Sequence, residues 1–521
     1  MSSDYPSIFN DVIGPVMRGP SSSHCAAAVR IGRLGRDLMA GRIDRVLIEF
    51  DSRGSLAFTH ASQGSDMGIF GGLLGWDAQD ERLLEAAAAL AEAGVQIDFR
   101  IGDFQDPHPN TYRLTISNPS EAHHLIAVST GGGMIEVISI DCVPLSIKGD
   151  YFATLIAIND LGMAMHETLR KNVAAEEILL HSGKDKSIIE IRSRKPLSEP
   201  VKDLLAAHEG VTWIRTLSPV LPVLSRKGIQ VPFVSCARML DWNRDHHLDL
   251  AGLAAVYESA RGDIPEEEVC RRMESVIAIL RRSIAQGIAG TLYADRILGV
   301  QSAGFKTAME TASLLDAGML NSMILYVTAL MEVKSAMGII VAAPTAGSCG
   351  GLPGAVIAAA DAMGRSETDM ARAMLAAGMV GVFIAAHSTF AAEVCGCLAE
   401  CGSGSGMAAA ALVTLAGGSA RQAVDAASMA IQNVMGMICD PVANRVEVPC
   451  LGRNVLAAAN ALACANMALG GYDAVIPLDE VIATMDRVGR SIPMELRCTT
   501  LGGLSITPAS KAIENRLRAT G

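Results

Sequence analysis

Aromatic side chains are scarce in this sequence, and features that mark several protein classes are missing. Phe, Trp and Tyr make up 4% of the 521 residues. There is no basic run, and the net charge of −12 argues against a nucleic-acid-binding protein. Neither internal repeats nor a low-complexity tail are present. With 50 Gly and 25 Met in a chain that is 50% apolar, the composition predicts closely packed helices of small residues, with Met filling gaps.

Export and membrane segments are also lacking by sequence criteria. The start, MSSDYPSIFNDV, does not have the charged-then-apolar layout of an export signal. The longest apolar stretch, Met374–Ala386, is shorter than the roughly 18 residues that a membrane span needs. The 12 cysteines fit a reducing cytoplasm, where thiols serve metals or chemistry rather than disulfides. We therefore expect a cytoplasmic protein of two to four domains.

The first part of the chain, residues 1–148, mixes predicted strands with predicted helices. Alternating apolar residues predict strands at Arg45–Phe50, Tyr112–Ser117 and Val137–Cys142. Residues Asp80–Gly94 have the pattern of an amphipathic helix that ends at its glycine. These features predict an N-terminal α/β domain.

Residues 149–218 are predicted to follow the order strand, helix, strand, strand, helix, strand. The predicted strands are Tyr151–Ile158, Glu177–His181, Ser187–Arg192 and Thr212–Leu217, and the helices are Leu161–Lys171 and Ser198–His208. This is the ferredoxin-like βαββαβ pattern, a common scaffold that does not identify a function. Since no nucleophile or metal-ligating set lies within it, we expect a separable module that regulates or assembles rather than catalyses.

From about residue 236 to 521 the sequence is predicted to be helical. Residues Ile264–Gln286 form one long predicted helix with an acidic first turn. Met374–Ala386 and Met407–Ala416 are apolar all round, which is typical of helices in the interior of a large bundle. The whole chain is therefore predicted to be α+β, with a C-terminal all-α domain.

Three cysteines in the last quarter of the chain are the strongest chemical signal: Cys397, Cys439 and Cys450. Three thiolates suit a four-iron cluster that leaves one iron open. An open iron is a Lewis acid and can take a hydroxyl group off a substrate. By spacing alone, buried free cysteines in an Ala-rich core explain the same residues.

Two loops of small residues are candidate ligand sites. Ser21–Ser23 and His24 precede an Ala-rich predicted helix that runs to about Gly41, and such a start offers hydroxyl and N–H groups to an anion. Plain N-capping explains the serines as well. Pro344–Gly354 would allow the backbone to approach a ligand closely, or it is simply a turn between helices.

A polar stretch after Gly54 stands out from apolar neighbours. It contains His60, Gln63, Ser65 and Asp66. A turn with a helix cap explains this stretch without any function. The same holds for the turn at residues 106–111.

Taken together, these motifs resemble the iron–sulfur L-serine dehydratases (L-serine ammonia-lyases). The two-subunit form with an ACT domain is the most similar, here fused in one chain. The matching stretches follow one another along nearly the whole chain: GPSSSH (19–24), GS…GSD (54–66), QDERL (79–83), HPNT (108–111), GGG (131–133), APTAGSCGGLPG (343–354), AECGSGSGMAAAA (399–411), CDPVANRVEVPC (439–450), RN (453–454) and ELRCTTLGGLSITP (495–508).

The resemblance implies three domains: a β-like domain over residues 1–148, an ACT-like domain over 149–218, and an all-helical catalytic domain over 236–521. It implies a [4Fe-4S] cluster bound by Cys397, Cys439 and Cys450. It also implies conversion of L-serine to pyruvate and ammonia, a step of amino-acid catabolism and gluconeogenesis. We expect a homo-oligomer, a dimer, with no nucleic-acid or membrane partner. The implied substrate-binding residues are Ser21, Ser22, Ser23, Ser65, Asp66, Thr345, Gly347 and Ser348.

The chain departs from the family pattern at two positions near these motifs. Gln63 stands where the family commonly has His, and Lys334 stands where it has Asn. Because an amide cannot remove the Cα proton, we expect His60 to be the base, with Lys334 and His24 as the alternatives. The departures leave two other functions open: the same chemistry on another β-substituted small acid, and a non-catalytic amino-acid sensor.

Overall fold

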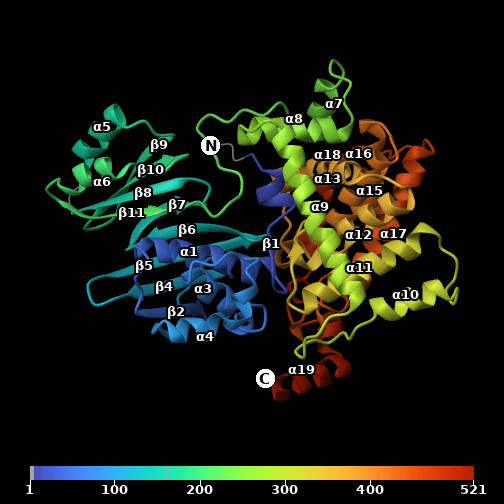
Figure 1. The fold of residues 1–521 in the computed structure, drawn as a ribbon, viewed down its shortest axis with the longest axis horizontal. Helices are drawn as coiled ribbons and strands as arrows, with labels where there is room; N and C mark the ends of the chain where they lie inside the picture. Colours follow the sequence, from blue (N-terminus) through green and yellow to red (C-terminus); the bar gives the residue numbers. More distant parts are fainter. Residues whose placement is uncertain (1–4, 160–161, 521) are drawn as a thin grey trace. The chain divides into compact units, whose positions relative to one another are not determined.

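The computed structural model describes residues 5–159 and 162–520. These residues form two compact units (Figure 1). One unit contains the described residues of 1–22 together with those of 230–521, and it is almost entirely helical. The other covers 23–229 and contains the two large sheets. The predicted mixture of α and β structure with a helical C-terminal part is confirmed, whereas the division into three domains stays a prediction.

A six-stranded sheet forms the larger part of the second unit, in the order β3-β2-β4-β5-β6-β7. Its neighbouring strands are antiparallel except for the parallel pair β2 and β3. The strands are β2 (Arg45–Asp51), β3 (Gln96–Gly102), β4 (Thr111–Ser117), β5 (Ala122–Gly131), β6 (Met134–Ile140) and β7 (Val143–Ile147).

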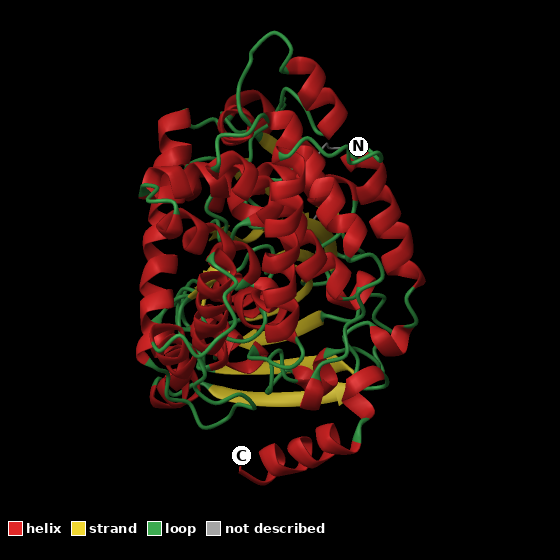
Figure 2. Ribbon diagram, turned by 90° about the vertical axis from the view of Figure 1, so that its right-hand side faces the viewer, coloured by secondary structure: helices red, strands yellow, loops and turns green. Residues whose placement is uncertain are grey.

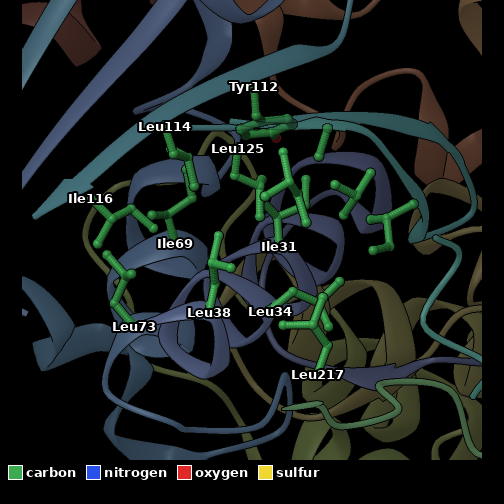
Figure 3. Close-up of a cluster of buried hydrophobic side chains, with 14 of the residues drawn as sticks. Ile31, Leu34, Leu38, Ile69, Leu73, Tyr112, Leu114, Ile116, Leu125 and Leu217 are labelled. Carbon is green, nitrogen blue, oxygen red and sulfur yellow. The ribbon is translucent and has the colours of Figure 1, made fainter. Parts of the chain in front are cut away.

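Helices α1 (Ala27–Leu38) and α3 (Ser65–Leu73) supply the apolar side chains that pack against this sheet (Figure 3). Ile31, Leu34 and Leu38 of α1 follow helical spacing and meet alternate residues of β4, such as Leu114 and Ile116 (Figure 3). The two periodicities, 3.6 and 2, therefore place apolar faces opposite each other. This packing fixes the short segment between β2 and α3, which carries His60.

The predicted strands of residues 1–148 are present, and some of the predicted boundaries are wrong. The strand predicted at Val137–Cys142 lies earlier, as β6, because Asp141 and Cys142 adopt positive φ angles of 50° and 67° in the turn to β7. The helix predicted at Asp80–Gly94 is divided into a 3-10 turn, η3 (Glu81–Glu85), and α4 (Ala86–Glu92). The strands β3, β5 and β7 are additional to the prediction.

The βαββαβ order of the middle module is confirmed. Its elements are β8 (Phe152–Ile158), α5 (Met163–Asn172), β9 (Glu177–Ser182), β10 (Ser187–Ser193), α6 (Glu199–Ala206) and β11 (Val211–Leu217). The sheet order is β11-β8-β10-β9, with antiparallel neighbours. Leu161 of the predicted first helix lies outside the described residues.

The module shares a hydrophobic core with the six-stranded part of its unit. Ala153, Leu155 and Ala157 of β8 belong to the same buried cluster as α1 and β4, whereas Ile156 and Ile158 face a second cluster under α5 and α6. β8 is therefore buried on both faces, which explains why all of its residues except Thr154 are apolar. A module packed in this way is not expected to separate cleanly from residues 23–148, contrary to the expectation from its sequence.

The helical unit contains thirteen α-helices among its described residues. They are α7 (Cys236–Trp242), α8 (Leu250–Gly262), α9 (Glu266–Ala289), α10 (Ser302–Glu310), α11 (Met319–Ser335), α12 (Gly351–Ala362), α13 (Glu367–His387), α14 (Ala392–Cys395), α15 (Ser403–Leu415), α16 (Ala420–Asn433), α17 (Cys450–Leu469), α18 (Leu478–Ser491) and α19 (Pro508–Thr520). Short turns lie between them: η4 (Ala346–Ser348), η5 (Leu398–Gly402), η6 (Val442–Asn444), η7 (Met494–Leu496) and η8 (Gly503–Ile506). The last helix, α19, packs on η6 and η8. It projects from the body of the helical unit at the lower edge of Figure 2.

Helix α15 lies at the centre of the bundle, against α12, α13, α16 and α17. Nearly all of its residues and most of those of α13 are buried, as their apolar sequences predict. Serine caps begin the neighbouring helices: Ser366 and Ser419 each form a capping box, with Asp369 and Gln422. The long helix predicted at Ile264–Gln286 is confirmed as α9 and begins one residue after Pro265.

Two helical segments of this unit are long and apolar enough to cross a membrane by length and composition, Glu367–His387 and Leu398–Leu415. The sequence alone predicts no such segment, because the apolar run Met374–Ala386 is shorter than a membrane span. The helix that contains this run, Glu367–His387, is long enough. The most apolar windows of the two segments are 78% and 89% buried inside the protein. They are core helices of the bundle.

The N-terminal segment belongs to the helical unit. Its turn η1 (Ile8–Val12) packs on α13, and β1 (Val16–Met17) pairs with β12 (Ile340–Val341). The carboxylate of Glu258 in α8 accepts hydrogen bonds from the Ser7 hydroxyl (2.5 Å) and the Ile8 N–H (2.8 Å). The segment thus holds β12, which leads directly into the small-residue loop at residue 343.

Candidate functional site

Cys397 and Cys439 come together in the helical unit, as predicted for metal ligands. Cys397 immediately precedes η5, and Cys439 lies in the irregular segment after α16. In the part of the chain that the structure describes, the ligand atoms of Cys397, Glu400 and Cys439 all lie within 4.8 Å of one another. Cys397 and Glu400 from one segment and Cys439 from another thus form a group that can hold a metal.

Cys450, the third predicted ligand, is the first residue of α17. The 4.8 Å group of described residues does not include it. Burial raises the pKa of the Cys450 thiol, and nearby Cys397 and Lys334 act on it electrostatically in opposite directions. Cys450 therefore lies close enough to Cys397 for their charges to interact, but it is not one of the residues whose ligand atoms all lie within 4.8 Å of one another.

Glu400 is the acidic member of the group and was not among the predicted site residues. It accepts a hydrogen bond of 2.6 Å from the Thr345 hydroxyl and one of 3.9 Å from the Cys397 thiol. Burial raises the pKa of Glu400 to about 7, and the nearby carboxylate of Glu393 acts in the same direction. A β-carbon at Gly347 would lie 2.8 Å from a Glu400 oxygen, so a larger residue at this position would have to displace the Glu400 carboxyl group.

Arg453 supplies positive charge beside the cysteines. Its Nη1 donates to the sulfur of Cys397 at 3.4 Å, and its Nη2 donates to Asp440 at 2.6 Å. Asp440 also accepts a hydrogen bond from the N–H of Leu504, which ties the C-terminal GGLS motif to this site. The Arg453 guanidinium thus places a positive charge in direct contact with the Cys397 sulfur.

Asn454 connects the small-residue loop to α17. Its amide nitrogen donates to the carbonyl oxygens of Gly347 (2.9 Å) and Cys450 (2.8 Å), and its oxygen accepts from the N–H groups of Gly350 and Gly351. The side chain is fully buried and uses both donors and its acceptor. Asn454 thereby fixes the distance between the loop and the start of the Cys450 helix.

Lys334 is fully buried in α11, and its ammonium group donates to the carbonyl oxygen of Val446. It lies close enough to Cys450, Cys349 and Glu400 to act on their ionisation. The sequence made Lys334 one of the two alternatives to His60 as the base. Its contacts make it a buried cation beside the group of thiols and carboxylates.

The loop that contains Thr345, Gly347 and Ser348 is shorter than predicted. The turn η4 follows Thr345, and α12 begins at Gly351, so the residues 351–354 are helical. Ser348 donates to the carbonyl oxygen of Ala343, and it also accepts from the Thr345 N–H. Since Thr345 and Ser348 are buried, the loop is a rigid support for Glu400.

A histidine–carboxylate pair lies in the other unit. Nδ1 of His60 is 2.7 and 2.9 Å from the two carboxylate oxygens of Asp66. The His60 ring stacks on Phe99, with 5.3 Å between centroids, and lies next to Phe50. The aromatic contacts and the carboxylate together fix the orientation of the imidazole, an arrangement that suits a general base.

His24 and the serine run lie at the start of α1. Ser22, Ser23 and His24 are buried within the first, π-helical turn, η2 (Ser22–Ala26), so this helix begins at the serines rather than after them. It ends at Leu38, before the predicted Gly41. Nε2 of His24 lies 3.0 Å from the Thr59 hydroxyl, and burial lowers the pKa of His24 to about 4. His24 is therefore a weaker base than an exposed imidazole.

The other predicted substrate-binding residues differ in their surroundings. The Ser65 hydroxyl is buried and hydrogen-bonded to Tyr112, at 2.9 Å, whereas Asp66 holds His60. The boundary between the two units falls inside the serine run, after Ser22. Thr345, Gly347 and Ser348 belong with Cys397, Cys439 and Lys334 to the helical unit, and His60, Ser65 and Asp66 belong to the other.

Four residues of the helical site were not singled out from the sequence: Glu400, Asp440, Arg453 and Asn454. Each lies inside a stretch on which the resemblance rests, namely AECGSGSG, CDPVANRVEVPC and RN. The sequence signal was thus present at the level of the motif. The individual roles follow from contacts across 50 or more residues, such as Thr345–Glu400 and Gly347–Asn454.

The donor set fits a metal centre that uses thiolate ligands. Hydrogen bonds with Cys397 and Cys498, together with burial, raise the pKa of Cys439 well above its ordinary value. A buried thiolate therefore needs a nearby positive charge, which Arg453 and Lys334 supply in part and a bound metal would supply fully. Soft thiolate ligands favour zinc, copper(I) or iron–sulfur clusters.

Comparison with known sequences identifies the family. Residues 153–505 match the family described as "Serine dehydratase alpha chain". The chain belongs to the serine dehydratase family. It is 32% identical over 285 residues to "Probable L-serine dehydratase, alpha chain" of Bacillus subtilis. The aligned region covers 55% of this chain and 95% of that protein.

Two further relatives support a fusion of the family's two chains. "Probable L-serine dehydratase, beta chain" of Bacillus subtilis is 44% identical over 157 residues, 30% of this chain and 70% of that protein. "L-serine dehydratase" of Helicobacter pylori is 24% identical over 502 residues, 94% of this chain and 96% of that protein. Relatives of both the alpha and the beta kind thus match this single serine dehydratase chain.

Proposed function

We propose that this serine dehydratase is an iron–sulfur lyase that converts L-serine to pyruvate and ammonia. The observation that carries the proposal is the Cys397–Glu400–Cys439 group with Arg453 beside it, inside the region that matches the family. The names of the relatives, L-serine dehydratase, support the substrate.

Cys397, Cys439 and Cys450 are the proposed ligands of a [4Fe-4S] cluster. A buried set of thiols near two cations has the softness and the charge that such a cluster needs. When bound, a cluster held by three cysteines supplies a Lewis acid that helps the hydroxyl group of serine to leave. The chain's own residues provide the rest of the chemistry.

The residues around the cysteines orient and stabilise the site. Arg453 and Lys334 offset the negative charge of the thiolates, and Asn454 keeps the loop at Gly347 against α17. We place the substrate against the loop residues Thr345, Gly347 and Ser348, and we assign the serine run Ser21–Ser23 to its carboxylate. Glu400, which contacts the same loop through Thr345, has carboxyl oxygens that can accept hydrogen bonds from the substrate ammonium group.

We assign removal of the Cα proton to His60. Asp66 holds Nδ1, which leaves Nε2 as the atom that takes the proton and stabilises the imidazolium that forms. His24 is less suitable because burial lowers its pKa to about 4, and Lys334 is already engaged with Val446. Loss of the Cα proton and of hydroxide from serine leaves an enamine, which tautomerises and is hydrolysed to pyruvate and ammonia.

The βαββαβ module is proposed to be an ACT-like regulatory domain. Its strand order, β11-β8-β10-β9, and its lack of a described metal-ligating group support a role outside the chemistry. We further propose that the enzyme works in the cytoplasm and that it is a homodimer. Sedimentation of the purified protein would test the oligomeric state.

Anaerobic purification followed by a substrate screen tests the proposal. We expect a brown protein that forms pyruvate from L-serine faster than from other β-substituted amino acids. A brown protein that turns over a different substrate would show that serine is not the substrate, while the cluster chemistry would stand. A colourless protein that is stabilised against heat by an amino acid without converting it would show a sensor instead.

A further inference from the structure

The six-stranded sheet has two edges, and only one of them is protected against pairing with another strand. The edge strand β7 contains Pro144, and the register shifts where β7 pairs with β6. β7 also contacts β9 of the middle module. Proline, an irregular register and a covering element are the usual means by which an edge strand avoids pairing with another chain. The β7 edge is therefore unsuited to a further strand.

The other edge strand, β3, has none of these protections. It pairs with β2 in an unbroken parallel register, and its sequence QIDFRIG contains neither Pro nor Lys. Among the described residues, no strand pairs with its other side. The side chains of Phe99 and Ile101 are 42% and 51% exposed. An unprotected edge with exposed apolar side chains is a surface on which another strand can pair.

The backbone groups of β3 are divided between its two sides. At its first residue, the Gln96 N–H donates to the carbonyl oxygen of Asp44. At its last, the carbonyl oxygen of Gly102 accepts from the Ser52 N–H, so both ends bond on the side of β2. Successive residues of a strand direct their backbone groups to opposite sides, so every second residue directs its N–H and C=O to the open edge. These residues are Ile97, Phe99 and Ile101.

The sequence of β3 is self-complementary about Phe99. When two copies pair antiparallel with Phe99 opposite Phe99, Asp98 of each copy stands opposite Arg100 of the other. Ile97 likewise stands opposite Ile101. The residues with outward backbone groups then exchange hydrogen bonds, and the two charge pairs occupy the intervening positions, where side chains are closest. A two-fold axis through Phe99 generates this whole arrangement from one strand.

Charges on β2 extend this complementarity. Nη2 of Arg45 lies 2.7 Å from Oδ2 of Asp98, and Glu49 forms an ion pair with Arg100. Across the paired edge, the signs therefore alternate from Arg45 and Asp98 of one copy to Arg100 and Glu49 of the other. A register that brings Asp98 opposite Asp98, or Arg100 opposite Arg100, would place like charges together. The charges thus favour the register centred on Phe99.

We propose that β3 pairs antiparallel with β3 of a second copy of this chain, so that one sheet continues through both copies. The inference goes beyond the proposed chemistry and rests on the proposed homodimer, because it assigns the surface of that dimer. Phe99 also stacks on His60. The contact between copies therefore adjoins the proposed base and holds the strand against which its imidazole lies.

Sedimentation velocity of the anaerobically purified full-length holoenzyme tests this surface. We expect the wild type to be a dimer. Asp98→Arg and Arg100→Asp each place like charges at both cross-strand positions, and each should raise the dissociation constant of the dimer by about tenfold or more. An equal mixture of the two variants should form dimers again, because opposite charges then meet at both positions. Each chain keeps its own internal contacts in the mixture, so recovery reports on the contact between copies alone.

Two further variants complete the test. Asp245→Arg, at an exposed position of the helical unit, is the matched control and should remain a dimer. Ile101→Pro removes an N–H that faces the open edge and should also produce monomers, which decides the matter if the charge variants do not fold.

A monomeric wild type would overturn the proposal. So would charge variants that remain as dimeric as the wild type, or a mixture that does not recover. Iron content and pyruvate formation, measured on the same wild-type samples, test the proposed function separately from the contact between copies.

Discussion

The two units of this protein each contain a candidate group, and the two groups are built in opposite ways. In the helical unit, Cys397 with Glu400, Cys439, and Arg453 come from three separate segments, and their side chains are buried or half-buried. In the other unit, His60 and Asp66 are six residues apart, and their side chains are 21% and 20% exposed. The first group depends on the packing of the whole bundle, whereas the second is a local pair.

This difference suits different chemical tasks. Thiolates that bind a metal need positive charge and exclusion of water, which a bundle interior provides. A base must meet its substrate and exchange protons with solvent, which a partly exposed imidazole can do. Damage to the helical group should therefore remove the cofactor, and damage to the pair should remove turnover alone.

Replacement of a cysteine ligand is expected to have the largest effect. Cys397→Ser, Cys439→Ser and Cys450→Ser should each reduce bound iron by at least about tenfold, because loss of a direct ligand exceeds the effect of losing a supporting residue. Iron and sulfide analysis of anaerobically purified protein measures this. Cys464→Ser is the matched control and should keep its full iron content. If all three variants keep theirs, the ligand assignment is wrong.

Replacement of His60 in the His60–Asp66 pair should have the opposite result, a loss of turnover without a loss of iron. His60→Ala is expected to lower kcat by about 100- to 10,000-fold, the usual contribution of a general base, with iron content unchanged. The measurement is solvent deuterium exchange at Cα together with pyruvate formation. His124→Ala, at an exposed histidine of β5, should have no effect. Undiminished exchange in His60→Ala would redirect the search to Lys334.

The shared core of the sheet unit can be tested at β8. Leu155→Ala should lower the free energy of unfolding by about 2–5 kcal/mol, because it leaves a cavity in the core that joins the module to α1 and β4. Denaturant unfolding measures the change. Met163→Ala in α5 is the control, since Met163 is 59% exposed. Equal small effects of both substitutions would mean that the module folds apart from its neighbour.

The smallest expected effect concerns the N-terminal segment. Glu258→Ala should destabilise the protein by about 1–3 kcal/mol, because the Ser7 hydroxyl and the Ile8 N–H lose their buried acceptor. Glu267→Ala, in the exposed first turn of α9, should change the melting temperature little. A melting temperature of Glu258→Ala equal to that of the wild type would exclude this anchoring role.

The same carboxyl group predicts a pH dependence. Burial raises the pKa of Glu258 above its usual value of 4.5, so the folded protein holds this proton to higher pH than the unfolded chain. The contribution of Glu258 to stability is therefore greatest below pH 4.5 and is lost as the pH rises through the folded-state pKa. Melting temperatures of the wild type and Glu258→Gln across this range should diverge with pH. Parallel curves would contradict the assignment.

Regular periodicity made much of the fold predictable. The four strands of the middle module lie within one or two residues of their predicted positions, because each alternates or is apolar between clear turn residues. The edge strand β3 was not predicted, although Ile97, Phe99 and Ile101 alternate with polar residues in its sequence, so the signal for this strand was present. The 3-10 turn at Glu81–Glu85 depends on the Asp80 cap and on packing against α3.

The candidate site was predictable in part. The sequence motifs named Cys397, Cys439 and Cys450, and the structure brings the first two together with Glu400. The role of Glu400 could not be foreseen, because it depends on a loop 55 residues earlier that approaches through Gly347. Asp66 was expected to bind substrate, and its contact with His60 follows from the turn between α2 (Leu56–Thr59) and α3.

The dependence of turnover on bound iron tests the central claim most directly. Pyruvate formation from L-serine would be measured on a series of anaerobic samples loaded with increasing amounts of iron and sulfide. We predict a rate that rises in proportion to the cluster content and falls to the background rate in the iron-free protein. A rate on L-serine that is independent of iron content would contradict the assignment of this chain as an iron–sulfur serine dehydratase.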